Sequence, residues 1–97
     1  MRKVFWNNLA KADYYQIIDY ILSNWGEIPA QDFIDQVDKI ESLLETGNVD
    51  FELTNRKDIR RCVLSKQVTL FYKNYGSHSV ELLRFWNNYQ DKRKMNF

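Results

Sequence analysis

The stretch IRRCVLSKQVTLFYKNYGSHSVELLRFW, residues 59–86, decides the fold of this chain. It contains three runs rich in β-branched and aromatic residues, 59–64, 68–73 and 78–86, separated by short polar or glycine-containing segments. Runs of this kind, bounded by turn residues, are typical of strands joined as hairpins. Asn74 and Gly76, in the second separation, tolerate the positive φ that a short hairpin turn often requires. The stretch therefore predicts a three-stranded antiparallel meander.

A helical pattern precedes the meander. Apolar residues between Tyr14 and Trp25 recur at steps of three and four residues, which predicts an amphipathic helix. Asn7 or Asn8 is a suitable N-cap for this helix. Gly26 is a suitable end, because glycine readily adopts the positive φ that often follows the last helical turn.

A second apolar series at helical spacing comprises Ala30, Phe33, Ile34, Val37, Ile40 and Leu44. Pro29 is expected at the first helical position, where its missing N–H is tolerated, and Gly47 after the last turn. Asp32, Asp35 and Asp38 lie off the apolar stripe and are expected to form a solvated face. Two helices of similar length joined by a short turn form an antiparallel hairpin, whose apolar faces must be covered by the sheet.

The remaining segments complete the predicted fold. Val4, Phe5 and Trp6 indicate a short N-terminal strand that could add to the meander, and alternation at residues 49–53 is compatible with another short strand. Residues 87–97 are interpreted as a loop or a short terminal turn. The chain, residues 1–97, is therefore predicted to be one α+β domain, with a two-helix hairpin on one face of an antiparallel sheet of three to four strands.

Composition excludes several classes of function. A net charge of +1 provides no global cationic field for nucleic acid. Cys62 is the only cysteine and lies in an apolar strand run, so an internal disulfide is excluded and an inert core thiol is expected. With one cysteine and one histidine, His78, a metal site of nitrogen and sulfur ligands cannot be assembled. The sequence lacks a signal-peptide or membrane-spanning pattern, so we expect a cytoplasmic protein without metal or cofactor.

The order of elements resembles the RelE/ParE superfamily of bacterial toxins from type II toxin–antitoxin systems. The resemblance covers nearly the whole chain. It is carried by Phe5-Trp6, Asp13 and IIDYI at 17–21, the helix AQDFIDQVDKIESLLETG at 30–47, Arg60 or Arg61, LFY at 70–72 and VELLRFW at 80–86. The resemblance implies a plasmid-stabilisation toxin that inhibits growth and is held by the C-terminal segment of a cognate antitoxin. It also implies one of two targets, DNA gyrase or messenger RNA on the ribosome.

The two targets require different chemistry. Metal-free RNA cleavage needs several cations around one phosphate and a group that transfers a proton. The residues available for that role are Arg60, Arg61, Arg84 and Tyr89, whereas Thr69, Phe71, Asn87 and Asn88 stand where the RNA-cleaving branch would supply further charge. The sequence therefore favours an inhibitor of gyrase over an enzyme. A ribosome-dependent endoribonuclease is the alternative, and a non-toxic peptide-binding α+β module is the second alternative.

A surface for the partner is expected on the sheet. Strand residues alternate in direction, so Arg60 and Arg61 should point to opposite faces. The helices can cover only one face, which leaves an apolar patch around Phe71, Leu83 and Phe85, or their alternates along the strands, for the tail or another chain. The basic run Lys92, Arg93 and Lys94 is either a further partner contact or a solubilising tail.

Overall fold

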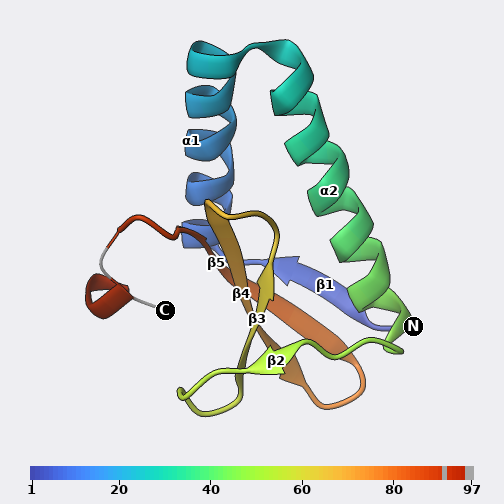
Figure 1. Ribbon diagram of the computed structural model, residues 1–97. Helices are drawn as coiled ribbons and strands as arrows, with labels where there is room; N and C mark the ends of the chain where they lie inside the picture. The colour runs from blue at the N-terminus through green and yellow to red at the C-terminus, as the bar shows by residue number, and fades with distance from the viewer. Residues whose placement is uncertain (91, 96–97) are drawn as a thin grey trace.

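The computed structural model describes residues 1–90 and 92–95 and places two helices on one side of a five-stranded sheet (Figure 1). The elements in chain order are β1 (Lys3–Trp6), α1 (Asn8–Trp25), α2 (Glu27–Thr46), β2 (Glu52–Leu53), β3 (Ile59–Val63), β4 (Val68–Tyr75), β5 (Ser79–Asn87) and the short 3₁₀ helix η1 (Lys92–Lys94). The predicted α+β architecture, with its helical hairpin and meander, is confirmed.

The sheet is larger than predicted and is mixed. Its strand order is β1-β5-β4-β3-β2, and β1 runs parallel to β5, whereas the other pairs are antiparallel. A parallel pair is possible because no tight turn joins β1 to β5: α1, α2 and the strands β2 to β4 lie between them in the chain. The predicted antiparallel meander is confirmed, but the sheet has five strands rather than three to four, and the added strand β1 makes it mixed.

Local sequence determines the helix boundaries. The Asn7 side chain accepts a hydrogen bond of 2.8 Å from the Ala10 amide and caps α1, as predicted. Gly26 has φ of 97° and separates the two helices, and Gly47 ends α2 in the left-handed region. Pro29 lies two residues inside α2 rather than at its first position. Its missing N–H is still tolerated there because first-turn amides have no intrahelical partner.

The core lies between the helices and the sheet. Phe33, Val37 and Leu44 of α2 are buried against Leu70, Tyr72, Val80 and Leu82 of the meander, and Tyr14, Ile17 and Ile21 of α1 pack around them. From α1, only Ala10 is completely enclosed. The outer half of the hairpin extends beyond the sheet (Figure 1), so its apolar residues are covered less well.

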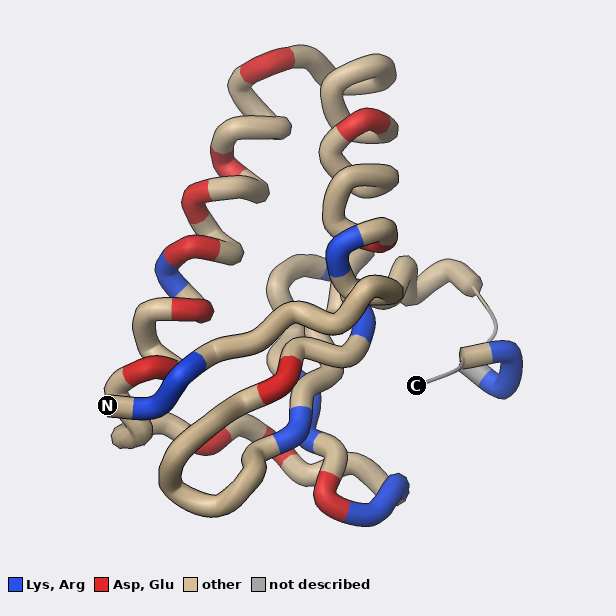
Figure 2. The backbone as a smooth tube through the Cα atoms, turned by 180° about the vertical axis from the view of Figure 1, so that it is seen from behind, with Lys and Arg blue, Asp and Glu red and all other residues tan. Residues whose placement is uncertain are grey.

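Charge is unevenly distributed over this architecture. The two helices carry eight Asp and Glu residues against two Lys, whereas the rest of the chain carries twelve Lys and Arg residues against five Asp and Glu (Figure 2). A near-neutral chain is therefore strongly polarised, with opposite signs of charge at its two ends.

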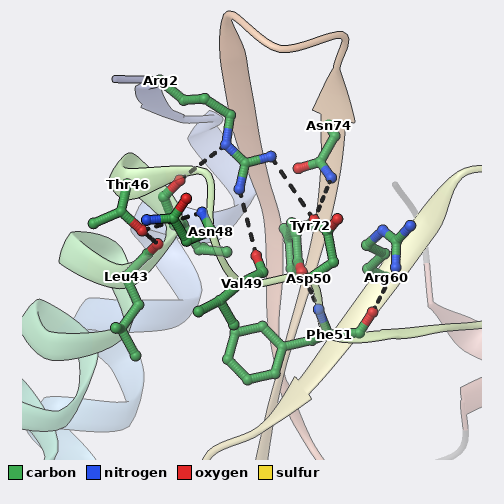
Figure 3. A network of polar contacts seen from close by, with 11 residues as sticks. Arg2, Leu43, Thr46, Asn48, Val49, Asp50, Phe51, Arg60, Tyr72 and Asn74 are labelled. Atoms are coloured by element: carbon green, nitrogen blue, oxygen red, sulfur yellow. Dashed lines mark hydrogen bonds and ion pairs between the residues drawn. The ribbon is translucent and has the colours of Figure 1, made fainter.

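Arg2 anchors the start of the chain to the end of α2. The side chain is 7% exposed, and its Nε donates to the Leu44 carbonyl at 3.0 Å (Figure 3). The guanidinium also reaches the Val49 carbonyl at 3.5 Å and the Asp50 carboxylate at 3.9 Å. A cation at the C-terminal end of a helix satisfies carbonyls that have no intrahelical donor and interacts favourably with the helix dipole.

Candidate partner-binding site

Arg60 and Arg61 point to opposite faces of the sheet, as the strand pattern predicted. Arg60 pairs with Tyr72 across β3 and β4, and Arg61 pairs with Phe71. The Arg60 Nη1 donates to the Phe51 carbonyl at 2.7 Å, and the Phe51 amide donates to the Tyr72 hydroxyl at 2.9 Å (Figure 3). Arg60 therefore fixes the segment before β2 against the helix-covered side of the sheet.

Arg61 lies on the opposite face and forms an exposed ion pair. Its Nε and Nη2 are each 3.1 Å from a Glu52 carboxylate oxygen, in a two-pronged arrangement. The hydrogen bond from Arg61, and then its charge, lower the pKa of Glu52 below its ordinary value. Both groups are solvated, so the pair orients the guanidinium more than it stabilises the fold.

Three arginines from different segments line one cavity beside this pair. The cavity has a volume of about 470 Å³, and we call it the arginine pocket. Its lining residues are Leu53, Thr54, Asn55, Arg56, Arg61, Phe71, Arg93 and Met95. The Arg56 Nη2 donates to the Met95 carbonyl at 3.5 Å and connects the β2–β3 turn to the C-terminal segment.

The aromatic patch predicted on this face exists but is covered. Phe71 and Trp86 are each 5% exposed, and Met95 packs against them at 6% exposure, with Ile59 alongside. Leu83 is also buried. The tail, one of the two covers that the sequence allowed, therefore occupies this position.

Phe85 does not belong to the patch. It contacts Trp6, Tyr14 and Phe33 in the core under the helices. A bulge between Phe71 and Tyr72 changes the register of β4 against β5, so Phe71 is paired with Arg84 and Tyr72 with Leu82. The bulge shifts which residues of β5 face the helices, and simple alternation therefore placed Phe85 on the wrong side.

Arg84 is held by a carboxylate that is distant in sequence. Its Nε and Nη2 donate to Asp13 of α1 at 2.7 and 2.9 Å, and the Phe85 amide donates to the same carboxylate at 3.1 Å. The two side chains are 15% and 13% exposed. Hydrogen bonding to Asp13 raises the pKa of Arg84, and the guanidinium also lies 5.2 Å from the Trp86 ring.

The four residues considered for RNA cleavage do not converge. Arg84 and Tyr89 line one cavity of about 340 Å³ together with Asp13 and Gln67. Arg61 lines the arginine pocket, and Arg60 is bound to the Phe51 backbone. Tyr89 is 74% exposed. Phosphate chemistry without a metal needs several cations on one phosphate, and these four side chains are not brought together in that way in the described part of the chain.

The residues of the C-terminal basic run do not share one environment. Arg93 lines the arginine pocket, Lys94 is exposed, and the side chain of Lys92 lies outside the described residues.

Two residues of the arginine pocket, Arg56 and Met95, were not predicted from the sequence. The antiparallel pairing of Glu52 with Arg61 places the β2–β3 turn next to Arg61, but nothing in the sequence shows that the tail folds back onto this face.

The other candidate residues are inert or exposed. Cys62 is 5% exposed, and burial raises the pKa of its thiol to about 11. His78 is exposed in the β4–β5 turn. Within residues 1–90 and 92–95, metal-ligating side chains do not gather in any group of three or more. In the same part of the chain, every helix is too short or too polar to cross a membrane.

Solved structures share this fold. A chromosomal ParDE toxin–antitoxin system from P. aeruginosa superimposes with a TM-score of 0.74 at 17% identity, over 90% of this chain and 96% of that one. The E. coli DinJ–YafQ toxin–antitoxin complex gives a TM-score of 0.60 at 11% identity, over 89% and 91%. HP0894 from Helicobacter pylori, a conserved hypothetical protein, gives 0.57 at 19% identity, over 91% and 96%. No curated protein has a significant sequence match.

The strand, helical hairpin and meander place the chain in the fold class of these solved structures, which is the fold that the sequence resemblance to RelE/ParE toxins predicted. Within that class, the model of the ParE toxin of the type II toxin–antitoxin system parDE matches residues 4–91. The chain belongs to this ParE toxin family.

Proposed function

We propose that this toxin acts in the cytoplasm by inhibiting DNA gyrase, and that an antitoxin neutralises it by placing an acidic segment over the arginine pocket. The observation that carries the choice of target is the separation of Arg60, Arg61 and Arg84 into three different environments. A family member without a converged cationic centre is better suited to inhibit by binding than to cleave RNA.

The arginine pocket supports the antitoxin site through its chemistry. Three guanidinium groups beside the exposed side chain of Leu53 suit a peptide that supplies carboxylates and one apolar anchor. The complexes formed by the ParDE and DinJ–YafQ relatives are consistent with an antitoxin partner for this chain.

The target is tested with two assays on the purified, antitoxin-free chain. We expect inhibition of supercoiling by gyrase, and no codon-positioned cuts in primer extension on ribosome-bound message. Two tyrosines, Tyr20 and Tyr89, line the cavity that contains Arg84. Tyr89→Phe is the control for RNA cleavage, because it removes the hydroxyl of the tyrosine that the sequence indicated as a proton-transfer group. Cuts by the wild type that disappear in Tyr89→Phe would overturn the gyrase proposal.

The antitoxin site is tested with Arg61→Ala combined with Arg93→Ala. A charged hydrogen bond contributes about 1.5–3 kcal/mol, so we expect the double variant to bind the antitoxin encoded beside it at least about tenfold more weakly by calorimetry. Lys66→Ala, in the exposed β3–β4 turn, is the matched control. Equal affinity of the double variant and the control would place the antitoxin elsewhere.

A further inference from the structure

The outer half of the helical hairpin carries only negative charge. Residues 12–38 contain six carboxylates and no Lys, Arg or His, in a chain with fourteen Lys and Arg. Asp13 is neutralised by Arg84. The other five, Asp19, Glu27, Asp32, Asp35 and Asp38, are exposed, and Figure 2 shows the acidic positions spread over both helices.

The same end of the hairpin exposes large apolar side chains. Leu22, Trp25 and Ile28 are 46%, 62% and 78% exposed, on either side of the joint at Gly26. Trp25 also borders a groove of about 410 Å³ between the hairpin and the β3–β4 turn. The groove is lined by Ile21, Trp25, Pro29, Asp32, Phe33, Gln36, Ser65, Gln67 and Val68.

Large apolar residues exposed at one end of a hairpin, one of them lining a groove, are typical of a protein interface. The surrounding carboxylates determine which kind of partner can approach. An acidic peptide or a nucleic acid would bring like charge next to Glu27, Asp32 and Asp35, which costs free energy, whereas a cationic surface gains it. The arginine pocket has the opposite preference, so the two surfaces select different partners.

We infer that the outer end of the hairpin is a docking surface for a cationic protein partner, with Trp25 and Ile28 as apolar anchors and Glu27, Asp32 and Asp35 as the acidic rim. The identity of that partner rests on the proposed function. An enzyme that holds duplex DNA must present a positively charged surface to the phosphates, and the acidic rim is complementary to such a surface on gyrase.

The anchors are tested with the double variant Trp25→Ser/Ile28→Ser. Both side chains are more exposed than buried, so the fold and antitoxin binding should be retained; circular dichroism and calorimetry check this. We expect the concentration that half-inhibits supercoiling to rise about tenfold or more, the scale of losing interface anchors. Val63→Ser, which replaces an apolar residue that is 65% exposed on the sheet, is the control and should leave the half-inhibiting concentration unchanged.

The rim is tested with Glu27→Gln/Asp32→Asn. We expect weaker inhibition at low salt and a flatter dependence on ionic strength, because the variant keeps the shape but loses the charge. Asp58→Asn, in the exposed β2–β3 turn, removes one carboxylate away from the hairpin and should preserve the wild-type salt dependence.

The outcomes separate this inference from the choice of gyrase. If the wild type inhibits gyrase and the anchor variant inhibits it equally, the docking surface is wrong and the gyrase proposal stands. If the wild type does not inhibit gyrase, growth arrest on induced expression becomes the readout. If the anchor variant still binds antitoxin but no longer arrests growth, the result supports the docking surface, with a cationic partner other than gyrase. If the anchor variant arrests growth as strongly as the wild type, the docking surface is wrong.

Discussion

Asp13 and Arg84 illustrate what one pair of residues contributes to this fold. They join α1 to β5 across 71 residues of sequence, and the carboxylate receives three hydrogen bonds. Strand periodicity gave the position of Arg84 on β5, and helical periodicity gave that of Asp13 on α1. Neither pattern shows that α1 packs beside the part of β5 that is not paired with β1. The ion pair between Asp13 and Arg84 could therefore not be predicted from the sequence.

Removing Arg84 should destabilise the protein. Arg84→Ala leaves the Asp13 carboxylate largely buried with only the Phe85 amide as a donor, and we expect a loss of about 2–3 kcal/mol in the free energy of unfolding. Urea denaturation at neutral pH measures it. Asp13→Ala and the double variant complete a cycle, and additive losses would show that the two side chains do not act as a pair.

Cys62 should make stability depend on pH in the alkaline range. Its pKa is raised by burial from 9.0 to about 11, so the folded state retains the proton that the unfolded state loses. The stability contributed by the neutral thiol is complete below pH 9 and is lost as the pH rises toward 11. Between pH 8 and 10.5, unfolding free energy should therefore fall more in the wild type than in Cys62→Ala. Parallel curves would contradict this cause.

At the scale of elements, two aliphatic residues of α2 differ in how deeply they are buried. Leu44 is fully buried, whereas Ile40 is only partly buried against the core. We expect Leu44→Ala to cost about 2–5 kcal/mol, as enclosed aliphatic residues do, and Ile40→Ala to cost clearly less. Thermal and urea denaturation of both variants provide the comparison. A larger loss for Ile40→Ala would show that the packing of α2 is misassigned.

The elements themselves were readable from the sequence, but their partners were not. Periodicity, the Asn7 cap and the two glycines predicted both helices, and turn residues delimited the meander. The direction of β1 and the bulge at Phe71 and Tyr72 depend on tertiary packing. Arg60 and Arg61 were assigned to opposite faces correctly because the bulge lies outside β3, whereas Phe85 was not because β5 pairs across it.

At the scale of the whole molecule, the C-terminal segment covers part of the face opposite the helices. Met95→Ser removes the apolar cover from Phe71 and Trp86. We expect a loss of about 1–3 kcal/mol and increased binding of a dye that fluoresces on apolar surface. Lys94→Ser, an exposed neighbour, is the control. Unchanged dye binding in Met95→Ser would indicate that another part of the chain covers the patch.

The separation of charge described for the two ends of the molecule also gives it a permanent electric dipole. A net charge of +1 exerts little attraction or repulsion at long range, but a dipole experiences a torque in the field of a charged partner. A cationic partner would rotate the molecule so that the hairpin leads, and an acidic one would rotate it so that the sheet leads. Encounters of either kind would thus be oriented before contact, and the rates of both associations should fall as salt shortens the range of the field.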